Sequence, residues 1–317
     1  MSRKKYLVVV SFLLLIGCFY FVFRNFINFH ELNSKNIDNK KQPIGGVALR
    51  ASGGESDSVL ANKSSSKIVK SSYSANNYLN AKNLDSYIDD LKKSDEKNVS
   101  IAKAKAFEEC RILAIRPNFV SELPEVAGST NQKNTILLKK YGSEFTNRCA
   151  DLVQHEPISR KIVEESYNKA ASDGSLEAMA YQLKKEVSDV YGNPSPDASR
   201  IDGLHEKLID LVSVGDPSTI FSLSELFGDN SKFSGPATGS NIAVAAWQLA
   251  ACDMGLDCSE SSTLLRNFCF GGMYCEAGDL RTNMRNVAFS PFDFEKVLQL
   301  EKEIYGDIKN GAVKKLF

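Results

Sequence analysis

Cysteines are the residues whose number and spacing most clearly suggest chemistry in this sequence. Apart from Cys18 near the start, there are six: Cys110, Cys149, Cys252, Cys258, Cys269 and Cys275. The last four form two pairs with five residues between their members, and glycines inside both loops let the chain turn back on itself. We predict the disulfides Cys110–Cys149, Cys252–Cys258 and Cys269–Cys275, although spacing alone leaves other connectivities open.

Two other uses of these thiols compete with disulfides. In a reducing cytosol they would be buried free thiols, and the four C-terminal cysteines could instead bind zinc. Zinc-binding pairs prefer about two to four intervening residues, whereas both pairs here have five. The sequence contains no Cys-x-x-Cys, which argues against thioredoxin-like redox chemistry. Structural disulfides in an oxidising compartment therefore remain the preferred interpretation.

Acid–base chemistry has few candidates. The three histidines are His30, His155 and His205. His205 is followed by Glu206 in a predicted helix, where adjacent side chains do not face each other. His155 lies at a predicted helix end, where its cation is favoured by the helix dipole. The sequence also lacks His-Glu-x-x-His, the P-loop, Gly-x-Ser-x-Gly and the dinucleotide-binding glycine motif. We therefore assign no catalytic, cofactor-binding or metal-binding residue.

Two consecutive helices are predicted to position the first cysteine pair. Apolar residues recur every fourth position at Leu137, Tyr141, Phe145, Cys149 and Val153, which is typical of one buried helical face. The preceding segment repeats this pattern at Ala102, Ala106, Cys110 and Ala114 and ends near Arg116-Pro117. Antiparallel packing of these faces would bring Cys110 and Cys149 to disulfide distance.

The remainder of the body has the same helical character. Further helices are predicted near residues 158–172, 175–191, 200–214, 217–228, 240–254, 259–269 and 293–309. Asp216-Pro217 is typical of a helix start, with Asp216 as N-cap and Pro217 at the first helical position. No run of alternating β-branched residues indicates a strand. We predict an all-α domain over residues 84–317.

The N-terminal segment predicts a membrane anchor. After a short basic tail at residues 1–5, positions 6–23 contain no charge, and 18 residues of helix rise about 27 Å, enough to span a bilayer core. No Ala-x-Ala cleavage site follows, which disfavours a cleaved signal. Leu15-Ile16-Gly17-Cys18 resembles a bacterial lipobox, so a lipoprotein anchored through Cys18 is the alternative, although the chain stays apolar after Cys18.

Composition predicts a tether after the anchor, and the cysteines predict the side of the membrane on which the body lies. Residues 31–83 are rich in Ser, Asn, Lys and Gly, which predicts a disordered tether. Basic residues flank the span almost equally, so the cysteines decide the orientation: a single-pass bacterial inner-membrane protein with its body in the periplasm. The reverse topology, with free thiols in the cytosol, is a weaker alternative. The 39 basic residues balance 39 acidic ones, so no nucleic-acid partner is predicted.

A weak internal repeat lies within residues 160–270. Glycines at 174, 215 and 255 stand between predicted helices at offsets of 41 and 40 residues, a period typical of stacked helical hairpins. The segments Ala170-Ala171-Ser172-Asp173-Gly174 and Ala250-Ala251-Cys252-Asp253-Met254-Gly255 resemble the Sel1-like branch of the tetratricopeptide superfamily. That resemblance implies a concave surface for a protein or peptide partner. An irregular helical domain is the alternative.

Function follows only as an expectation. The segment from Trp247 to Cys258 also resembles C-terminal regions of membrane-anchored bacterial envelope proteins, which implies no activity. We expect a structural or protein-interaction module. The alternative is an envelope hydrolase acting on cell-wall material or a β-lactam, as proposed for disulfide-rich proteins with Sel1-like repeats, whose cysteine spacing differs. Such an enzyme would require Glu165, His155 or His205 to lie in a cleft beside other polar groups.

Overall fold

The computed structural model describes residues 75–94, 96–126, 132–192, 198–270 and 276–317. Within these ranges every regular element is a helix and no strand occurs, so the all-α prediction is confirmed for them. The predicted anchor at 6–23 and the tether up to residue 74 lie outside the described residues. Among the helices that the structure describes, none is long and apolar enough to cross a membrane.

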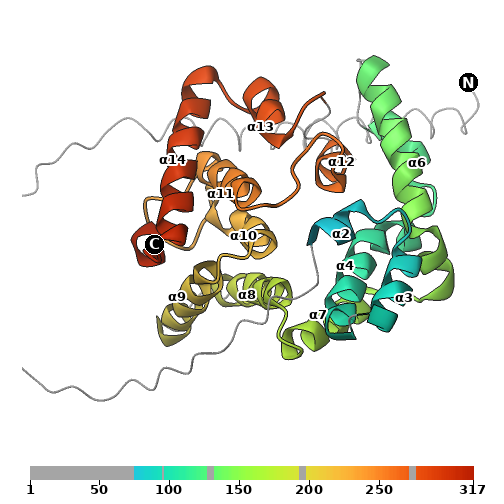
Figure 1. The fold of residues 1–317 in the computed structure, drawn as a ribbon, viewed down its shortest axis with the longest axis horizontal. Helices are drawn as coiled ribbons and strands as arrows, with labels where there is room; N and C mark the ends of the chain where they lie inside the picture. The colour runs from blue at the N-terminus through green and yellow to red at the C-terminus, as the bar shows by residue number, and fades with distance from the viewer. Residues whose placement is uncertain (1–74, 95, 127–131, 193–197, 271–275) are drawn as a thin grey trace, which may run out of the picture. The chain divides into compact units, whose positions relative to one another are not determined.

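The helices follow one another along the chain (Figure 1). Their bounds are α2 Ala75–Asn80, α3 Leu84–Ser94, α4 Glu96–Ile115, α5 Phe119–Val126, α6 Gln132–His155, α7 Arg160–Ser172, α8 Leu176–Tyr191, α9 Ala198–Ser213, α10 Pro217–Leu223, α11 Asn241–Asp253, α12 Thr263–Phe270, α13 Leu280–Asn283 and α14 Pro291–Lys309. Short 3-10 helices cover Ser224–Phe227 (η1) and Val313–Leu316 (η3), and a π-helical turn covers Met284–Ala288 (η2).

Helix α4 packs against α3, α6 and α7 in the N-terminal part of the body. Its alanines at 102, 104 and 106 are fully buried, and such small side chains let neighbouring helices approach closely. The disulfide Cys110–Cys149 joins α4 to α6 with a Cα separation of 5.5 Å. The sequence therefore identified both the apolar faces of these helices and the cysteine pair between them.

Glycine turns connect the next helices. Gly174, Gly215 and Gly255 have φ angles of 92°, 73° and 111°, a left-handed conformation that glycine adopts without a Cβ clash. Each glycine N–H donates to the carbonyl three residues earlier, which ends α7, α9 and α11 respectively. Ser175 and Asp216 then cap the N-termini of α8 and α10. The chain thus reverses at each predicted glycine.

Helix α11 contains the largest buried side chain of the C-terminal part. Trp247 is fully buried, and its ring N–H donates to the carbonyl of Ala237 at 2.8 Å. Phe227 and Phe317 lie against the indole. Because α11 packs extensively against α14 and also contacts α10, as Figure 1 shows, this tryptophan anchors the C-terminal core.

The first helix among the described residues lies inside the segment that was predicted as a tether. Residues 75–80 form α2 inside the segment 31–83 that composition assigned to the tether. Tyr78 and Leu79 are only 2% and 9% exposed, because they insert into the folded body. These two apolar side chains suffice to dock α2 on the body. The average composition of residues 31–83 is polar and conceals them. The ordered domain therefore begins before Leu84.

Candidate functional site

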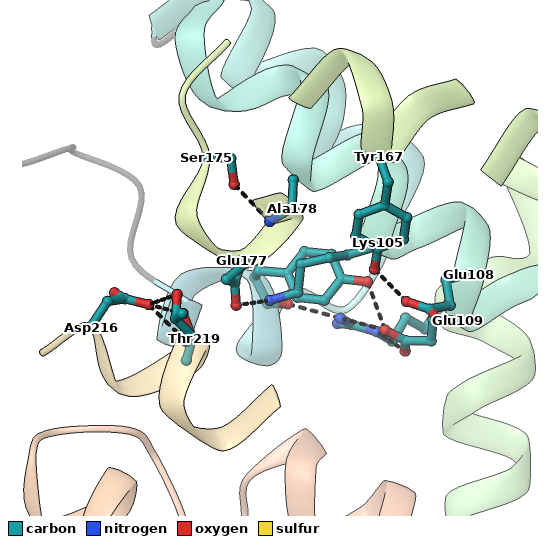
Figure 2. A network of polar contacts seen from close by, with 12 residues as sticks. Lys105, Glu108, Glu109, Tyr167, Ser175, Glu177, Ala178, Asp216 and Thr219 are labelled. Carbon is teal, nitrogen blue, oxygen red and sulfur yellow. Dashed lines mark hydrogen bonds and ion pairs between the residues drawn. The ribbon is translucent and has the colours of Figure 1, made fainter. Parts of the chain in front are cut away.

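A cavity of about 400 Å³ is the main candidate site. Its wall is built by α2, α4, α7, α8, α10 and α12 together with η1 and the loop after α11. We call it the tyrosine cavity. Its tyrosines and charged residues are Tyr78, Tyr167, Tyr181, Lys105, Lys184, Glu108, Glu109, Glu177 and Glu225. Figure 2 shows how part of this polar network converges from separate helices.

One ion pair lies across the tyrosine cavity. The Lys105 ammonium on α4 is 2.8 Å from Glu177 Oε1 at the start of α8, and the two side chains are 19% and 12% exposed. The same ammonium lies 4.7 Å from the centre of the Tyr78 ring, within cation–π range. Glu177 Oε2 is buried and has no hydrogen-bond partner in the described part of the chain. This carboxylate is therefore only half satisfied.

Two stacked tyrosines form part of the wall of the tyrosine cavity. The rings of Tyr167 and Tyr181 stack with centroids 3.8 Å apart and nearly parallel planes. The Tyr167 hydroxyl donates a hydrogen bond to Glu108 (Figure 2). Burial raises the pKa of Tyr167 well above its ordinary value, and the nearby charge of Glu108 raises it further. Tyr167 is thus a neutral hydrogen-bond donor at physiological pH.

A buried arginine fixes the side of the cavity near α2. Arg148 on α6 is 2.7 Å from Glu109 on α4, and these side chains are 5% and 11% exposed. The Tyr78 hydroxyl donates a hydrogen bond of 2.7 Å to the same carboxylate. Arg148 also donates to the backbone carbonyls of Tyr78 and Ala81. Burial alone would lower the pKa of Arg148, but the charge of Glu109 and its hydrogen bonds raise it, so the guanidinium remains charged.

A second cavity, of about 570 Å³, is lined by the other part of the α2 segment. Asn80, Ala81 and Lys82 contribute to it, as does an ion pair at 2.7 Å between Arg266 and Glu144. Neither a histidine nor a cysteine is among the described residues that line the two cavities. Within the described ranges, no group of three His, Cys, Asp or Glu residues is arranged to hold a metal ion.

The structure does not bring the enzyme candidates together. His155 is exposed at the end of α6 and contacts Asp85 at 3.0 Å. His205 is half-buried on α9 beside the ring of Phe233. Glu165 is exposed and pairs with Lys161 on its own helix. None of the three lines either cavity, so they form no joint acid–base site.

Two of the three predicted disulfides are found in the described part of the chain. Besides Cys110–Cys149, the structure contains Cys252–Cys258, which closes the loop after α11. Cys269 is also disulfide-bonded and buried, while its predicted partner, Cys275, lies outside the described residues. These bridges fix the helices around the site rather than lining the cavities.

Arg281 and Arg285 are four residues apart, a spacing that predicts one basic, solvated helical face, and the structure corrects this prediction for Arg281. Arg281 pairs with Glu301 at 2.5 Å and with Asp253 at 2.8 Å. Glu301 is only 2% exposed, so Arg281 joins α13, α14 and α11 instead of contributing to a solvated face. Local sequence could not indicate these ion pairs, because their members are far apart along the chain.

The cavity residues were missed by the sequence analysis, although one signal was present. Glu109 directly precedes Cys110, and Arg148 directly precedes Cys149. Opposite charges beside a predicted disulfide indicate an ion pair beside it.

Comparisons with protein-family models, with curated proteins and with solved structures found no match.

Proposed function

We propose that this protein is a membrane-anchored interaction module of the bacterial envelope that binds a segment of a partner protein in the tyrosine cavity. The observation behind this proposal is the cavity itself, in which tyrosines and charged side chains converge from separate helices. Tyrosine offers a large contact area and a polar tip, which suits it to protein interfaces. Buried ion pairs and a disulfide hold the wall in place, so less ordering is needed when a partner binds.

The charges of the lining define the partner segment. Four glutamates face two lysines, and the lysines are each paired with a glutamate, Lys105 with Glu177 and Lys184 with Glu225. Glu109 pairs with Arg148 behind the wall. Glu108 is in no ion pair within the described ranges and accepts a hydrogen bond from Tyr167. Charge complementarity therefore favours a partner segment with a basic side chain beside Glu108.

The location is inferred from other features. The uncharged N-terminal segment at 6–23 supports an anchor, and the two disulfides support an oxidising compartment such as the periplasm. The similar glycine turns at 174, 215 and 255 support a stack of helical hairpins. In such a stack, the cavity would lie on a surface suited to an extended partner segment.

Photo-crosslinking from the cavity tests the binding proposal. A benzophenone side chain replaces Ser222, which lines the tyrosine cavity, and in a control it replaces Ser188, which is exposed on α8. In membranes of the native host, Ser222 should give one reproducible protein adduct that a lysine-rich peptide suppresses and a glutamate-rich peptide does not. Equal adducts from both positions, or equal suppression by both peptides, would contradict the proposal. Unchanged thermal unfolding establishes that each variant is folded.

Mass spectrometry tests the location separately. Free thiols of the membrane-expressed protein are alkylated before and after reduction. We expect the cysteines from 110 to 275 to react only after reduction, and Cys18 to have no lipid. Reaction of all seven without reduction would place the body in the cytosol. A truncated mass with a lipid on Cys18 would instead indicate a lipoprotein.

A further inference from the structure

The α2 segment contributes side chains to both cavities. Tyr78 and Leu79 line the tyrosine cavity, whereas Asn80 and Ala81 line the second one. The helix has only six residues, too few to be stable without contacts to the rest of the body. Its position therefore depends on the side chains that hold it.

The first set of contacts holds α2 to the disulfide loop after α11. The Asn76 side chain donates to the Gly255 carbonyl at 3.0 Å and accepts from the Asp257 amide at 2.8 Å. Asn80 adds a contact to the Asp257 carboxylate at 3.4 Å. Both backbone groups that Asn76 binds lie inside the ring closed by Cys252–Cys258. The disulfide thus helps to fix the backbone that Asn76 recognises.

The second set of contacts holds α2 to α4 and α6. Glu109 accepts from the Tyr78 hydroxyl, and Arg148 donates to the Tyr78 carbonyl at 2.8 Å. These two charged residues directly precede Cys110 and Cys149 in the sequence. The disulfide Cys110–Cys149 therefore sets the spacing of Glu109 and Arg148, the pair that binds α2. Each of the two described disulfides lies beside one set of contacts to the same short helix.

The two disulfides differ in accessibility. Cys110 and Cys149 are fully buried, whereas Cys252 and Cys258 are only partly buried. Thiol–disulfide exchange requires a thiolate to reach a sulfur atom. A dithiol reductant will therefore open Cys252–Cys258 before Cys110–Cys149.

We propose that α2 is a strap that closes one side of the tyrosine cavity and is released when a dithiol reductant opens Cys252–Cys258. In this reaction the dithiol loses two electrons and two protons and becomes a disulfide, while Cys252 and Cys258 each become a thiol. The loop then gains conformational freedom, so the Gly255 carbonyl and the Asp257 amide no longer stay at the positions where Asn76 binds them. The expected loss of partner binding rests on the proposed function, whereas the release of α2 does not.

Chymotrypsin cleavage after Tyr78 measures this release directly, because Tyr78 is 2% exposed when α2 is docked. The rate of such cleavage follows the population of the open form. The full-length protein in detergent is treated with dithiothreitol until mass spectrometry shows that Cys252–Cys258 is open and Cys110–Cys149 is intact. The Cys252→Ser/Cys258→Ser variant removes the same bridge without a reductant.

Asn76→Ala and Asn77→Ala form a matched pair for the contacts themselves. Asn77 is exposed on the same helix, and no side-chain hydrogen bond of Asn77 is seen in the described part of the chain. Loss of the two hydrogen bonds of Asn76 should accelerate cleavage after Tyr78 about tenfold. Asn77→Ala should leave the rate unchanged, since alanine removes nothing that holds α2.

The outcomes are distinct. The proposal predicts faster cleavage after Tyr78 in the reduced protein, in the double serine variant and in Asn76→Ala, with unchanged cleavage at buried aromatic residues such as Trp247. An unchanged rate with Cys252–Cys258 open would overturn it. Equal acceleration at Trp247 would also overturn it, because the protein would then be unfolding globally. No partner is needed, so failure here leaves the proposed binding function standing.

Discussion

Replacing Arg148 by methionine tests whether the buried ion pair stabilises the wall of the tyrosine cavity. Methionine keeps much of the side-chain volume but removes the guanidinium. The change leaves Glu109 with the hydroxyl of Tyr78 and takes a donor away from the carbonyls of Tyr78 and Ala81. Arg148 and Glu109 are 5% and 11% exposed, so water replaces these contacts poorly.

The expected loss follows from that burial. Removing one partner of a buried ion pair costs about 3–5 kcal/mol, because the other charge remains without compensation. For a body of this size, about 1 kcal/mol lowers the unfolding midpoint by about 2–4 °C, so Arg148→Met should lower it by about 6–20 °C. The matched control is Arg160→Met, whose side chain is 83% exposed in its pair with Glu164. An exposed pair contributes about 0–1 kcal/mol, so the control midpoint should fall by at most about 4 °C.

The assay is thermal unfolding followed by circular dichroism at neutral pH without reductant, so that all disulfides stay closed. A second variant, Arg148→Met/Glu109→Gln, removes the unpaired charge and should be more stable than Arg148→Met alone by about 1–3 kcal/mol. If Arg148→Met behaves like Arg160→Met, the pair does not stabilise the wall. Glu109→Gln alone completes the set of variants. If the double variant shows the sum of the losses of Arg148→Met and Glu109→Gln, the two side chains are not coupled.

Two further predictions concern the turn and loop that position the helices. Gly215→Ala should lower the free energy of unfolding by about 1–2 kcal/mol, because φ is 73° at this turn. Gly203→Ala, inside α9 with open space around it, should raise the free energy of unfolding by about 0.5–1 kcal/mol. Thermal midpoints that move in the same direction in both variants would refute the assigned geometry. Burial alone would raise the pKa of Asp257, but hydrogen bonds from Ser259 and Asn80 outweigh it and hold that pKa below 3.8. The stability that this carboxylate contributes is therefore complete above pH 3.8 and lost as the pH falls through the lowered pKa, so the midpoint difference between the wild type and Asp257→Ala should be constant above pH 3.8 and shrink below it. A difference that shrinks already between neutral pH and pH 3.8 would contradict this assignment.

Most of the helices could be predicted from local sequence because their signals are local. The four-residue spacing around Cys149 and the Asp216-Pro217 start each involve neighbours on one helix, and both are found in the structure. Two of the predicted helix boundaries differ from those in the structure. The helix expected at 217–228 ends at Leu223 and continues as the 3-10 turn η1. The helix expected from residue 259 starts at Thr263, because residues 259–262 form a turn after the disulfide loop.

The tyrosine cavity could not be predicted in the same way, because its wall joins residues that are distant in sequence. Tyr78 and Asn267 line the same space, and nothing near either residue indicates the other. Tyr78 also lies in a segment whose average composition predicted a tether. Local composition measures whether a segment can form its own core, whereas α2 needs only to complete a core that other helices have built.

The disulfides offer a route from local sequence to this distant arrangement. A cysteine pair places its sequence neighbours at a nearly fixed separation, so the charges of Glu109 and Arg148 are brought together once Cys110–Cys149 is formed. Arg148 of that pair then binds the backbone of α2, and α2 in turn contributes Tyr78 and Leu79 to the wall of the cavity. Site formation should therefore be more sensitive to the residues beside the cysteines than to other charged residues, which is the contrast that Arg148→Met and Arg160→Met measure.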